Sequence, residues 1–301
     1  NEGVAVVPDV ASLPGVVQII RVSKPYRLAA LESTGGKPSV IPVGEALVGS
    51  NNSWFVAGPC SVDDPARLID IAHTVKALGA QALRGGAFKP RSNPYAFQGH
   101  GVEGLEMLAR AREATGLPIV TEAMDIEQVD AVEEYADVIQ IGARNMQNYQ
   151  LLKRVGRSKR TVLLKRGLSA TLDELLNAVE YVLAEGNCHV ILCERGIRTF
   201  ANHARFTLDV AAIPVLKALT HLPIIVDPSH PAGVRPLVLP LAQAGLAAGA
   251  DGLIVEVHPE PEHALSDADQ ALRYPDIAQL ADRGRRIAEA IGRTFGRPPA
   301  T

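Results

Sequence analysis

The chain from Trp54 onward repeats one pattern, in which a short run of apolar residues precedes a longer stretch with apolar residues at helical spacing. The runs begin at Trp54, Ala82, Pro118, Val138, Thr161, His189, Pro223 and Gly252. They are apolar throughout rather than alternating, as parallel strands buried on both faces are. Several of the intervening stretches follow Asp, Ser or Thr and end at Gly, which is typical of helices. The pattern therefore predicts eight strand and helix units.

Eight such units within residues 54–296 predict a single closed (β/α)8 TIM barrel, for which about 250 residues is the usual length. A doubly wound open sheet is the alternative, although it usually has fewer strands. Residues 36–53 contain VIPVGEALVGS, which alternates around a glycine and predicts a β-hairpin that caps the bottom of the barrel. Residues 1–35 are too few to fold alone and are expected to form an N-terminal extension.

Composition excludes several classes of function. The 30 basic residues are offset by 33 acidic ones, and the formal net charge of -3 gives no general attraction for nucleic acid or an anionic membrane. We find no apolar run of membrane-spanning length and no signal peptide pattern. Three cysteines without CxxC spacing predict neither a disulfide framework nor a structural zinc site. A reducing, cytoplasmic setting is expected.

The predicted strands end in polar or ionisable residues although their bodies are apolar. Their ends read GPC, RGGAFK, TE, GAR, LKRG, CERG, DPSH and EVH. In a (β/α)8 barrel these ends meet at one mouth, which is where active sites lie in this fold. The sequence therefore predicts that the functional residues gather there.

Five residues at these ends are basic: Arg84, Lys89, Arg144, Lys165 and Arg195. Guanidinium groups suit the recognition of phosphate and carboxylate, and cations gathered in one place are costly unless an anion joins them. A structural salt bridge to Glu122 or Glu194 would account for one of the five but hardly for all. The mouth is therefore expected to bind a multiply anionic ligand.

A second set combines a thiol, an imidazole and two carboxylates: Cys60, His230, Glu256 and Asp267. Such mixed sulfur, nitrogen and oxygen donors suit one divalent transition metal ion such as Mn, Fe, Co or Zn. Each residue alone also has a structural explanation, because a cysteine is often a buried apolar residue and a histidine can simply end a strand. Their convergence on one mouth favours the metal site. A substrate oxygen polarised by the metal, with phosphate groups held by the cations, would use both sets.

Seven stretches in consistent order across residues 40–285 resemble class I 3-deoxy-D-arabino-heptulosonate 7-phosphate (DAHP) synthase. They are GPCS, RGGAFKPRSNPYAFQG, IQIGARNMQN, LLKRG, ILCERGIRTF, IIVDPSHPAG and VEVHPEPEHALSDADQ. The closer match is to the subclass that is similar to 3-deoxy-manno-octulosonate 8-phosphate synthase. The resemblance implies a metal-dependent, aldol-like condensation of phosphoenolpyruvate with erythrose 4-phosphate and water that releases phosphate. This reaction is the first step of the shikimate pathway, which leads to chorismate and the aromatic amino acids.

The resemblance also implies roles for individual residues. The implied metal ligands are Cys60, His230, Glu256 and Asp267. The implied phosphoenolpyruvate site is Arg84, Lys89, Ala143, Arg144, Lys165 and Arg195, with Ala143 and Arg144 at the phosphate. The implied erythrose 4-phosphate site is Lys89, Pro90, Arg91, Ser92 and Asp267, with Ser92 in place of the usual Thr. The candidates for catalysis are Lys89, Cys60, His230 and Glu122.

Two other functions stay open at this point. 3-Deoxy-manno-octulosonate 8-phosphate synthase uses arabinose 5-phosphate and resembles the chain in its barrel, but usually has an Asn-Arg-Ser-Ser type segment where KPRS stands. The second alternative is a catalytically silent barrel with a regulatory or scaffolding role.

The N-terminal extension and the assembly are interpreted from the same resemblance. Residues 1–35 resemble the end of a ferredoxin-like regulatory domain, but they are too few to build one, and a tail that packs on the barrel is the simpler interpretation. The resemblance implies a homotetramer and leaves room for association with a chorismate mutase. The native metal and any feedback inhibitor are not predicted.

Overall fold

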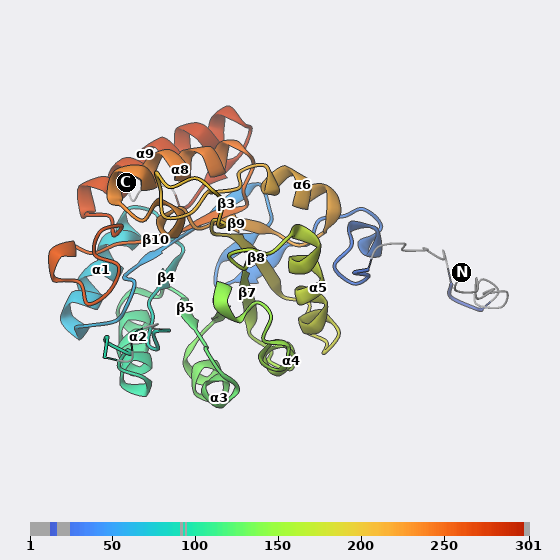
Figure 1. The fold of residues 1–301 in the computed structure, drawn as a ribbon, viewed down its shortest axis with the longest axis horizontal. Helices are drawn as coiled ribbons and strands as arrows, with labels where there is room; N and C mark the ends of the chain where they lie inside the picture. The colour runs from blue at the N-terminus through green and yellow to red at the C-terminus, as the bar shows by residue number, and fades with distance from the viewer. Residues whose placement is uncertain (1–12, 17–24, 91–92, 94, 298–301) are drawn as a thin grey trace.

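The structure is a computed structural model and describes residues 13–16, 25–90, 93 and 95–297. Eight parallel strands form the centre of the molecule (Figure 1). They are β3 (Asn52–Gly58), β4 (Ala82–Arg84), β5 (Ile119–Glu122), β6 (Val138–Ile141), β7 (Thr161–Lys165), β8 (Val190–Glu194), β9 (Ile224–Val226) and β10 (Gly252–Glu256). Each strand pairs with the next, and β10 pairs with β3, so the sheet closes into a barrel. The predicted (β/α)8 barrel is therefore confirmed.

Helices lie between successive strands and surround the barrel (Figure 1). The α-helices are α1 (Pro65–Ala77), α2 (Val102–Thr115), α3 (Ile126–Tyr135), α4 (Tyr149–Gly156), α5 (Leu172–Leu183), α6 (Ala212–Leu219), α7 (Ser229–Ala232), α8 (Arg235–Ala247) and α9 (Tyr274–Ala290). Short 3-10 helices are η2 (Leu31–Thr34), η3 (Ala143–Asn145) and η4 (Pro261–His263).

The helix ends follow the capping residues of the sequence. The side chains of Asp64 and Asp125 accept hydrogen bonds from backbone N–H groups in the first turns of α1 and α3. Thr171 and Glu174 form a reciprocal capping box at the start of α5. At the end of α2, Gly116 takes the left-handed conformation that glycine adopts without steric cost.

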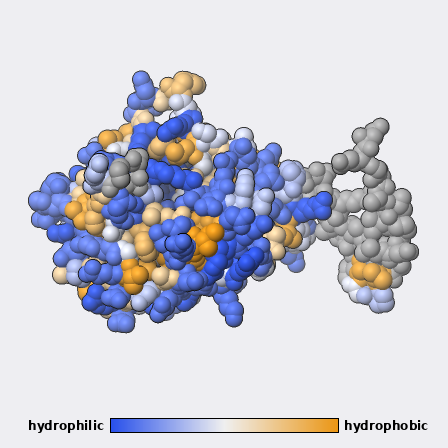
Figure 2. All heavy atoms as spheres, turned by 60° about the horizontal axis from the view of Figure 1, so that its bottom comes forward, coloured by the Kyte–Doolittle hydropathy of each residue, from blue (hydrophilic) through white to orange (hydrophobic). Residues whose placement is uncertain are grey.

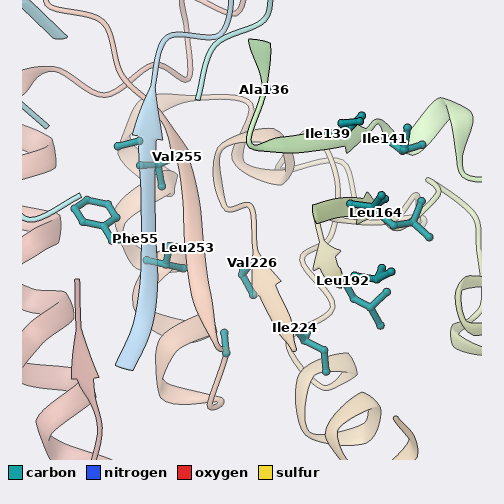
Figure 3. Close-up of a cluster of buried hydrophobic side chains, with 14 of the residues drawn as sticks. Phe55, Ala136, Ile139, Ile141, Leu164, Leu192, Ile224, Val226, Leu253 and Val255 are labelled. Carbon is teal, nitrogen blue, oxygen red and sulfur yellow. The ribbon is translucent and has the colours of Figure 1, made fainter. Parts of the chain in front are cut away.

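The strands are buried on both faces, which explains why their sequences are apolar throughout. Phe55 packs in the larger core between the strands and the helices, a part of which Figure 3 shows. The neighbouring residues Trp54 and Val56 belong to a second cluster, in the barrel interior. Consecutive strand residues therefore face opposite layers, as the pleat requires.

A β-hairpin precedes the barrel, as predicted. It consists of β1 (Ile41–Val43) and β2 (Ala46–Val48), which pair in antiparallel fashion. The side chains that alternate inward along both strands join the cluster of the barrel interior that includes Trp54. A short strand near the end of the chain, β11 (Thr294–Phe295), pairs with the first two residues of β3.

Residues 25–39 lie against the outside of the barrel, beside α5 and the end of α6 (Figure 1). The carboxylate of Glu180 accepts hydrogen bonds of 2.7 Å from the backbone N–H groups of Arg27 and Ala29. The His221 ring contacts the Leu28 carbonyl and the Ser39 hydroxyl at 2.9 and 2.7 Å. Most of the N-terminal extension precedes these contacts and lies outside the described residues.

The face of the molecule in Figure 2 is mainly hydrophilic. On the face in Figure 2, apolar residues form scattered groups between hydrophilic ones. Among the described residues, no helix is both long and apolar enough to cross a membrane.

Candidate active site

The carboxyl ends of the strands surround an open pocket with an empty volume of about 740 Å³. Its lining includes nine of the residues that the sequence predicted: Lys89, Pro90, Glu122, Ala143, Arg144, Lys165, Arg195, His230 and Asp267. It also includes Gln140, Gly142, Leu168, Arg205 and Phe206, which sequence reasoning missed. Arg91 and Ser92 of the KPRS segment lie outside the described residues.

Three of the candidate metal ligands form a compact group at one side of this pocket. One donor atom each of Cys60, Glu256 and Asp267 lies within 4.8 Å of the others. These residues come from the ends of β3 and β10 and from the loop before α9. The fourth candidate, His230 on α7, places Nε2 3.7 Å from Oε1 of Glu256. The four side chains predicted from the sequence thus meet in space.

The backbone at Asp267 has a positive φ of 49°, the one such value among non-glycine residues in the described ranges. A left-handed conformation is costly for a residue with a side chain, and such costs are typical of functional sites. The Asp267 carboxylate also accepts a hydrogen bond of 2.9 Å from the Cys60 thiol. This loop therefore holds its carboxylate at the cluster despite local strain.

The surroundings of the cluster favour the ionised form of its two carboxylates and oppose that of its thiol. Burial, together with the nearby charge of Glu256, raises the pKa of Cys60 to about 12. Burial also acts against the ionised form of Asp267, but the hydrogen bond from Cys60 and the charges of His230 and Lys89 lower its pKa overall. A divalent cation would relieve the repulsion between the carboxylates and favour the thiolate. The donor set therefore fits the implied metal ion.

Glu256 is completely buried and has partners on both carboxylate oxygens. Nη1 of Arg84 lies 2.9 Å from Oε1, and Nε2 of Gln270 donates to Oε2 at 2.5 Å. A second nitrogen of Arg84 donates to the Cys60 carbonyl at 3.2 Å. Arg84 thus lies beneath the group of candidate metal ligands rather than in the pocket lining. Gln270 is a further partner of Glu256 that the sequence did not reveal.

A buried acid that the sequence analysis did not single out joins the two predicted sets. Asp227 is 1% exposed, and its Oδ2 lies 2.5 Å from Nζ of Lys165 and 2.6 Å from Nδ1 of His230. Burial raises its pKa, but the charges of His230 and Lys165 bring it well below its usual value. Its position directly after β9, in the DPSH strand end, is the sequence signal that could have indicated it.

Lys89, Arg144 and Arg195 have no carboxylate within 4.0 Å in the part of the chain that the structure describes. Nζ of Lys89 donates to Cys60 instead, with distances of 3.0 Å to both the carbonyl oxygen and Sγ. Arg195 is 7% exposed, and Nη1 of its guanidinium has no hydrogen-bond partner among the described residues. Burial lowers the pKa of Arg195 from its ordinary value. A buried cation with a free donor is the signature of an anion site.

The two glutamates proposed as salt-bridge partners for the cations behave differently. Glu194 pairs with Arg166 at 2.8 Å, so it neutralises none of the five predicted cations. Glu122 lines the pocket and accepts a hydrogen bond of 3.1 Å from Gln140. A Cβ atom at Gly142 would lie only 2.2 Å from Oε1 of Glu122, so the carboxylate keeps its present position only because residue 142 is glycine.

The loop between β8 and α6 brings two further residues over the pocket. Residues Ile197 and Thr207 pair across this loop. The guanidinium carbons of Arg195 and Arg205 lie 4.8 and 5.7 Å from the centre of the Phe206 ring. Nη1 of Arg205 contacts Asp267 at 3.3 Å and Gln270 at 3.1 Å. Arg205 and Phe206 therefore line the pocket, and Arg205 lies beside the candidate metal ligand Asp267.

The glycines of RGGAFK allow the backbone to pack closely against its neighbours. A Cβ atom at Gly86 would lie 2.7 Å from the Cys60 carbonyl and 2.8 Å from Cδ of Lys89. A Cβ atom at Gly85 would lie 2.9 Å from Leu108. The backbone here passes directly beneath the side chain that lines the pocket.

Comparisons with known proteins agree with this geometry. The phospho-2-dehydro-3-deoxyheptonate aldolase of Thermotoga maritima is 48% identical over 281 residues, which cover 93% of this chain and 83% of the relative. The 2-dehydro-3-deoxyphosphooctonate aldolase of Syntrophotalea carbinolica is 32% identical over 259 residues, covering 80% of this chain and 92% of the relative.

Solved structures give the same result. The crystal structure of the Thermotoga maritima enzyme, a DAHP synthase, superposes with a TM-score of 0.88 at 46% identity, covering 95% of this chain and 83% of that chain. A truncated form of 3-deoxy-D-arabino-heptulosonate 7-phosphate synthase from Thermotoga maritima gives 0.84 at 44% identity, covering 89% and 98%. The model of the DAHP synthetase I family matches residues 31–292. With a relative this similar and a barrel of the same form, the chain belongs to the DAHP synthetase I family.

Proposed function

We propose that the chain condenses phosphoenolpyruvate with erythrose 4-phosphate and water to form DAHP and phosphate, the first step of the shikimate pathway. One observation carries this proposal: a thiol, imidazole and carboxylate cluster shares one mouth with cations that have no carboxylate partner among the described residues. Membership of the DAHP synthetase I family supports the same reaction.

Lys89, Arg144 and Arg195 are proposed to bind phosphoenolpyruvate, together with Lys165 and the backbone at Ala143. Phosphoenolpyruvate carries a phosphate and a carboxylate, and the buried Nη1 of Arg195 has a donor to offer. Lys165 already has Asp227 at 2.5 Å, so it adds less net charge than the other three. Arg84 does not line the pocket and is proposed to act by holding the Glu256 carboxylate in place.

Cys60, His230, Glu256 and Asp267 are proposed to hold one divalent ion such as Mn, Fe, Co or Zn. When bound, such an ion would polarise the aldehyde of erythrose 4-phosphate. This donor set suits several first-row metals, so the identity of the ion must be found by experiment. Asp267 would both hold the metal ion and contact erythrose 4-phosphate, since it also lines the pocket in which the aldose phosphate is expected.

The reaction requires two proton movements that side chains of the pocket can serve. C3 of phosphoenolpyruvate bonds to the aldehyde carbon, whose oxygen takes up a proton, while water adds to C2 and loses one. The bond between C2 and the phosphate oxygen then breaks, the remaining proton of the added water leaves with the phosphate, and C2 becomes the ketone carbon. Lys89, with Nζ at the edge of the cluster, is positioned to donate to the aldehyde oxygen. Glu122 faces the same pocket and is proposed to accept the proton of water.

The choice of aldose is proposed to depend on the KPRS segment. Lys89 and Pro90 line the pocket, while Arg91 and Ser92 are assigned to the phosphate of erythrose 4-phosphate by resemblance. The relative named for heptonate chemistry is 48% identical, against 32% for the octonate relative from Syntrophotalea. This difference favours the four-carbon aldose over arabinose 5-phosphate.

Phosphate release from phosphoenolpyruvate tests the function. The protein is stripped with a chelator, reloaded with Mn, Fe, Co or Zn, and assayed in parallel with erythrose 4-phosphate and arabinose 5-phosphate. Metal-dependent release with the four-carbon aldose alone is the expected result. Release with arabinose 5-phosphate alone would move the chain to octulosonate chemistry. No phosphate release with either aldose phosphate, in a protein that still binds metal, would contradict the enzyme assignment.

The assembly and setting are further proposals from family membership. We propose a homotetramer in the cytoplasm that can associate with a chorismate mutase. Light scattering after gel filtration checks the tetramer, and co-purification with a tagged chorismate mutase checks the association.

A further inference from the structure

We propose that Asp227 is a positioning residue that couples the metal cluster to the phosphoenolpyruvate side of the pocket. Its carboxylate would orient His230 toward the metal and adjust the charge that Lys165 offers to the substrate. Binding of the metal and binding of phosphoenolpyruvate would then strengthen each other through this one side chain. The inference rests on the proposed function, because it takes that metal and that substrate as the ligands.

The geometry that carries this inference is a shared oxygen atom. Oδ2 of Asp227 lies 2.5 Å from Nζ of Lys165 and 2.6 Å from Nδ1 of His230. Lys165 comes from β7 and faces the pocket, whereas His230 comes from α7 and reaches the metal cluster. No other carboxylate in the described part of the chain is within 4.0 Å of both a pocket lysine and a candidate metal ligand.

The carboxylate is held firmly in this place. Its side chain is 1% exposed, and its Oδ1 accepts a hydrogen bond of 3.1 Å from the backbone N–H of His230. The backbone N–H of Asp227 in turn donates to the Glu194 carbonyl at 2.9 Å. Asp227 is therefore fixed to the barrel and to α7 at once, and its oxygens cannot move away without moving the helix.

A carboxylate at Nδ1 determines how an imidazole presents its other nitrogen. A proton held on Nδ1 toward Asp227 leaves the Nε2 lone pair free, and Nε2 lies on the side of Glu256. The Nδ1 contact is close, but the ring does not meet the angle of a good hydrogen bond. A small rotation of the ring would complete that bond, and a cation on Nε2 would favour it.

Because Lys165 and His230 share one oxygen of Asp227, metal binding and phosphoenolpyruvate binding are expected to strengthen each other. When His230 donates more strongly from Nδ1, the Oδ2 charge is drawn toward the imidazole and neutralises Lys165 less. Lys165 is then a better partner for an anion. By linkage, an anion that draws on Lys165 leaves Oδ2 freer for His230 and strengthens metal binding by the same factor.

The alternative is that Asp227 merely balances charge inside the barrel, and Asp251 offers a matched control for it. The Asp251 side chain is 5% exposed and is likewise shared between two cations, with Lys217 at 2.7 Å and Arg293 at 3.0 Å. It precedes β10 and so lies at the opposite end of the barrel from Asp227. A purely structural role predicts that Asp227→Asn and Asp251→Asn have the same consequences.

The test measures binding rather than turnover, on the full chain. Co²⁺ is titrated without substrates and followed by its absorption, and phosphoenolpyruvate is titrated by calorimetry with and without Co²⁺. The ratio of the two phosphoenolpyruvate affinities is the coupling factor, which we expect to be at least about 5 in the original protein. Asp227→Asn is expected to weaken Co²⁺ binding by about 10–100-fold and to bring the coupling factor near one. Asp251→Asn is expected to change neither.

Co²⁺ affinity and a coupling factor that stay at the original values in Asp227→Asn would overturn the inference, as would equal losses in Asp251→Asn. If Asp227→Asn does not fold, as judged by circular dichroism, the same titrations are made on Asp227→Glu. This variant keeps the charge and moves the carboxylate oxygens by one methylene. A lowered coupling factor in Asp227→Glu supports the positioning role, and an unchanged one refutes it. If the original protein binds no Co²⁺, the proposed metal centre fails and the inference fails with it.

Discussion

Replacing Gly142 with alanine should cost far more activity than stability. Gly142 has φ -68° and ψ 159°, a backbone conformation that any residue adopts, so the substitution introduces no backbone strain. The added Cβ would instead lie 2.2 Å from Oε1 and 3.0 Å from Cδ of Glu122. The whole effect of Gly142→Ala therefore falls on one carboxylate of the pocket.

The size of the effect follows from these distances. Ordinary contacts of a Cβ atom begin near 3.4 Å, so Oε1 of Glu122 must move by roughly 1 Å. The carboxylate is the free end of a flexible side chain, and its displacement puts at risk mainly the hydrogen bond from Gln140. We expect about 1 kcal/mol of lost stability. Misplacement of a catalytic group by about 1 Å can cost about 100-fold in rate.

The assay compares kcat and KM for both substrates with the midpoint of thermal unfolding. Gly167→Ala is the matched control, because its Cβ would meet Ala170 and Met146 at 3.3 and 3.4 Å and would not touch Glu122. We expect a loss of about 100-fold in kcat/KM for Gly142→Ala and little change for Gly167→Ala. A Gly142→Ala protein with the kcat/KM of the original would refute the assigned role of Glu122.

Three further predictions concern the anion site, the metal and acid stability. Arg195→Ala should raise KM for phosphoenolpyruvate by about tenfold or more, from the loss of a charge-assisted hydrogen bond, with a smaller effect on KM for the aldose; equal effects on both would contradict the assignment. Chelation should abolish phosphate release while circular dichroism stays unchanged, because the barrel core does not involve the cluster; loss of the fold would contradict this. Although burial raises the pKa of Asp63, its contact with His258 at 3.5 Å and the charges of His258 and Arg67 lower it overall, so its contribution to stability is present above about pH 4 and lost at lower pH. Asp63→Asn should therefore flatten the fall of the unfolding free energy below about pH 4, and an unchanged acid limb in denaturant titrations would count against this ion pair.

The barrel was predictable because its signal is local and repeated. Each apolar run needs only its own residues to indicate a buried parallel strand, and each of the eight barrel strands overlaps one of these runs. The mouth was predictable for a geometric reason, since parallel strands all deliver their last residues to one end. Cys60, which follows β3, and Glu256, which ends β10, could thus be brought together from sequence.

What the sequence could not supply was the pairing of side chains across loops. Lys165 and Arg166 are neighbours in LKRG, but consecutive residues at a strand end face opposite sides. Lys165 lines the pocket, whereas Arg166 turns to Glu194 and Asp209. Glu194 therefore looked available to the pocket cations until the structure paired it elsewhere.

The sequence analysis also missed residues whose role depends on the side chains around them rather than on their own residue type. Asp227 lies in a quoted motif, but an aspartate at a strand end has no visible partner until the fold places Lys165 and His230 beside it. The requirement for glycine at position 142 is likewise a property of the space around Glu122 and of no local pattern.

The distribution of partners explains how so many charges can share one mouth in a stable protein. An unpaired charge in a barrel interior is costly, so the deepest ones are neutralised within the chain. Arg84 has Glu256 and Lys165 has Asp227, and the side chains of all four residues are at most 6% exposed. Lys89, Arg144 and Arg195 line the pocket without a carboxylate partner among the described residues, so their compensation must enter from outside. Folding thus neutralises the deepest charges within the chain and leaves Lys89, Arg144 and Arg195 available to an anionic ligand.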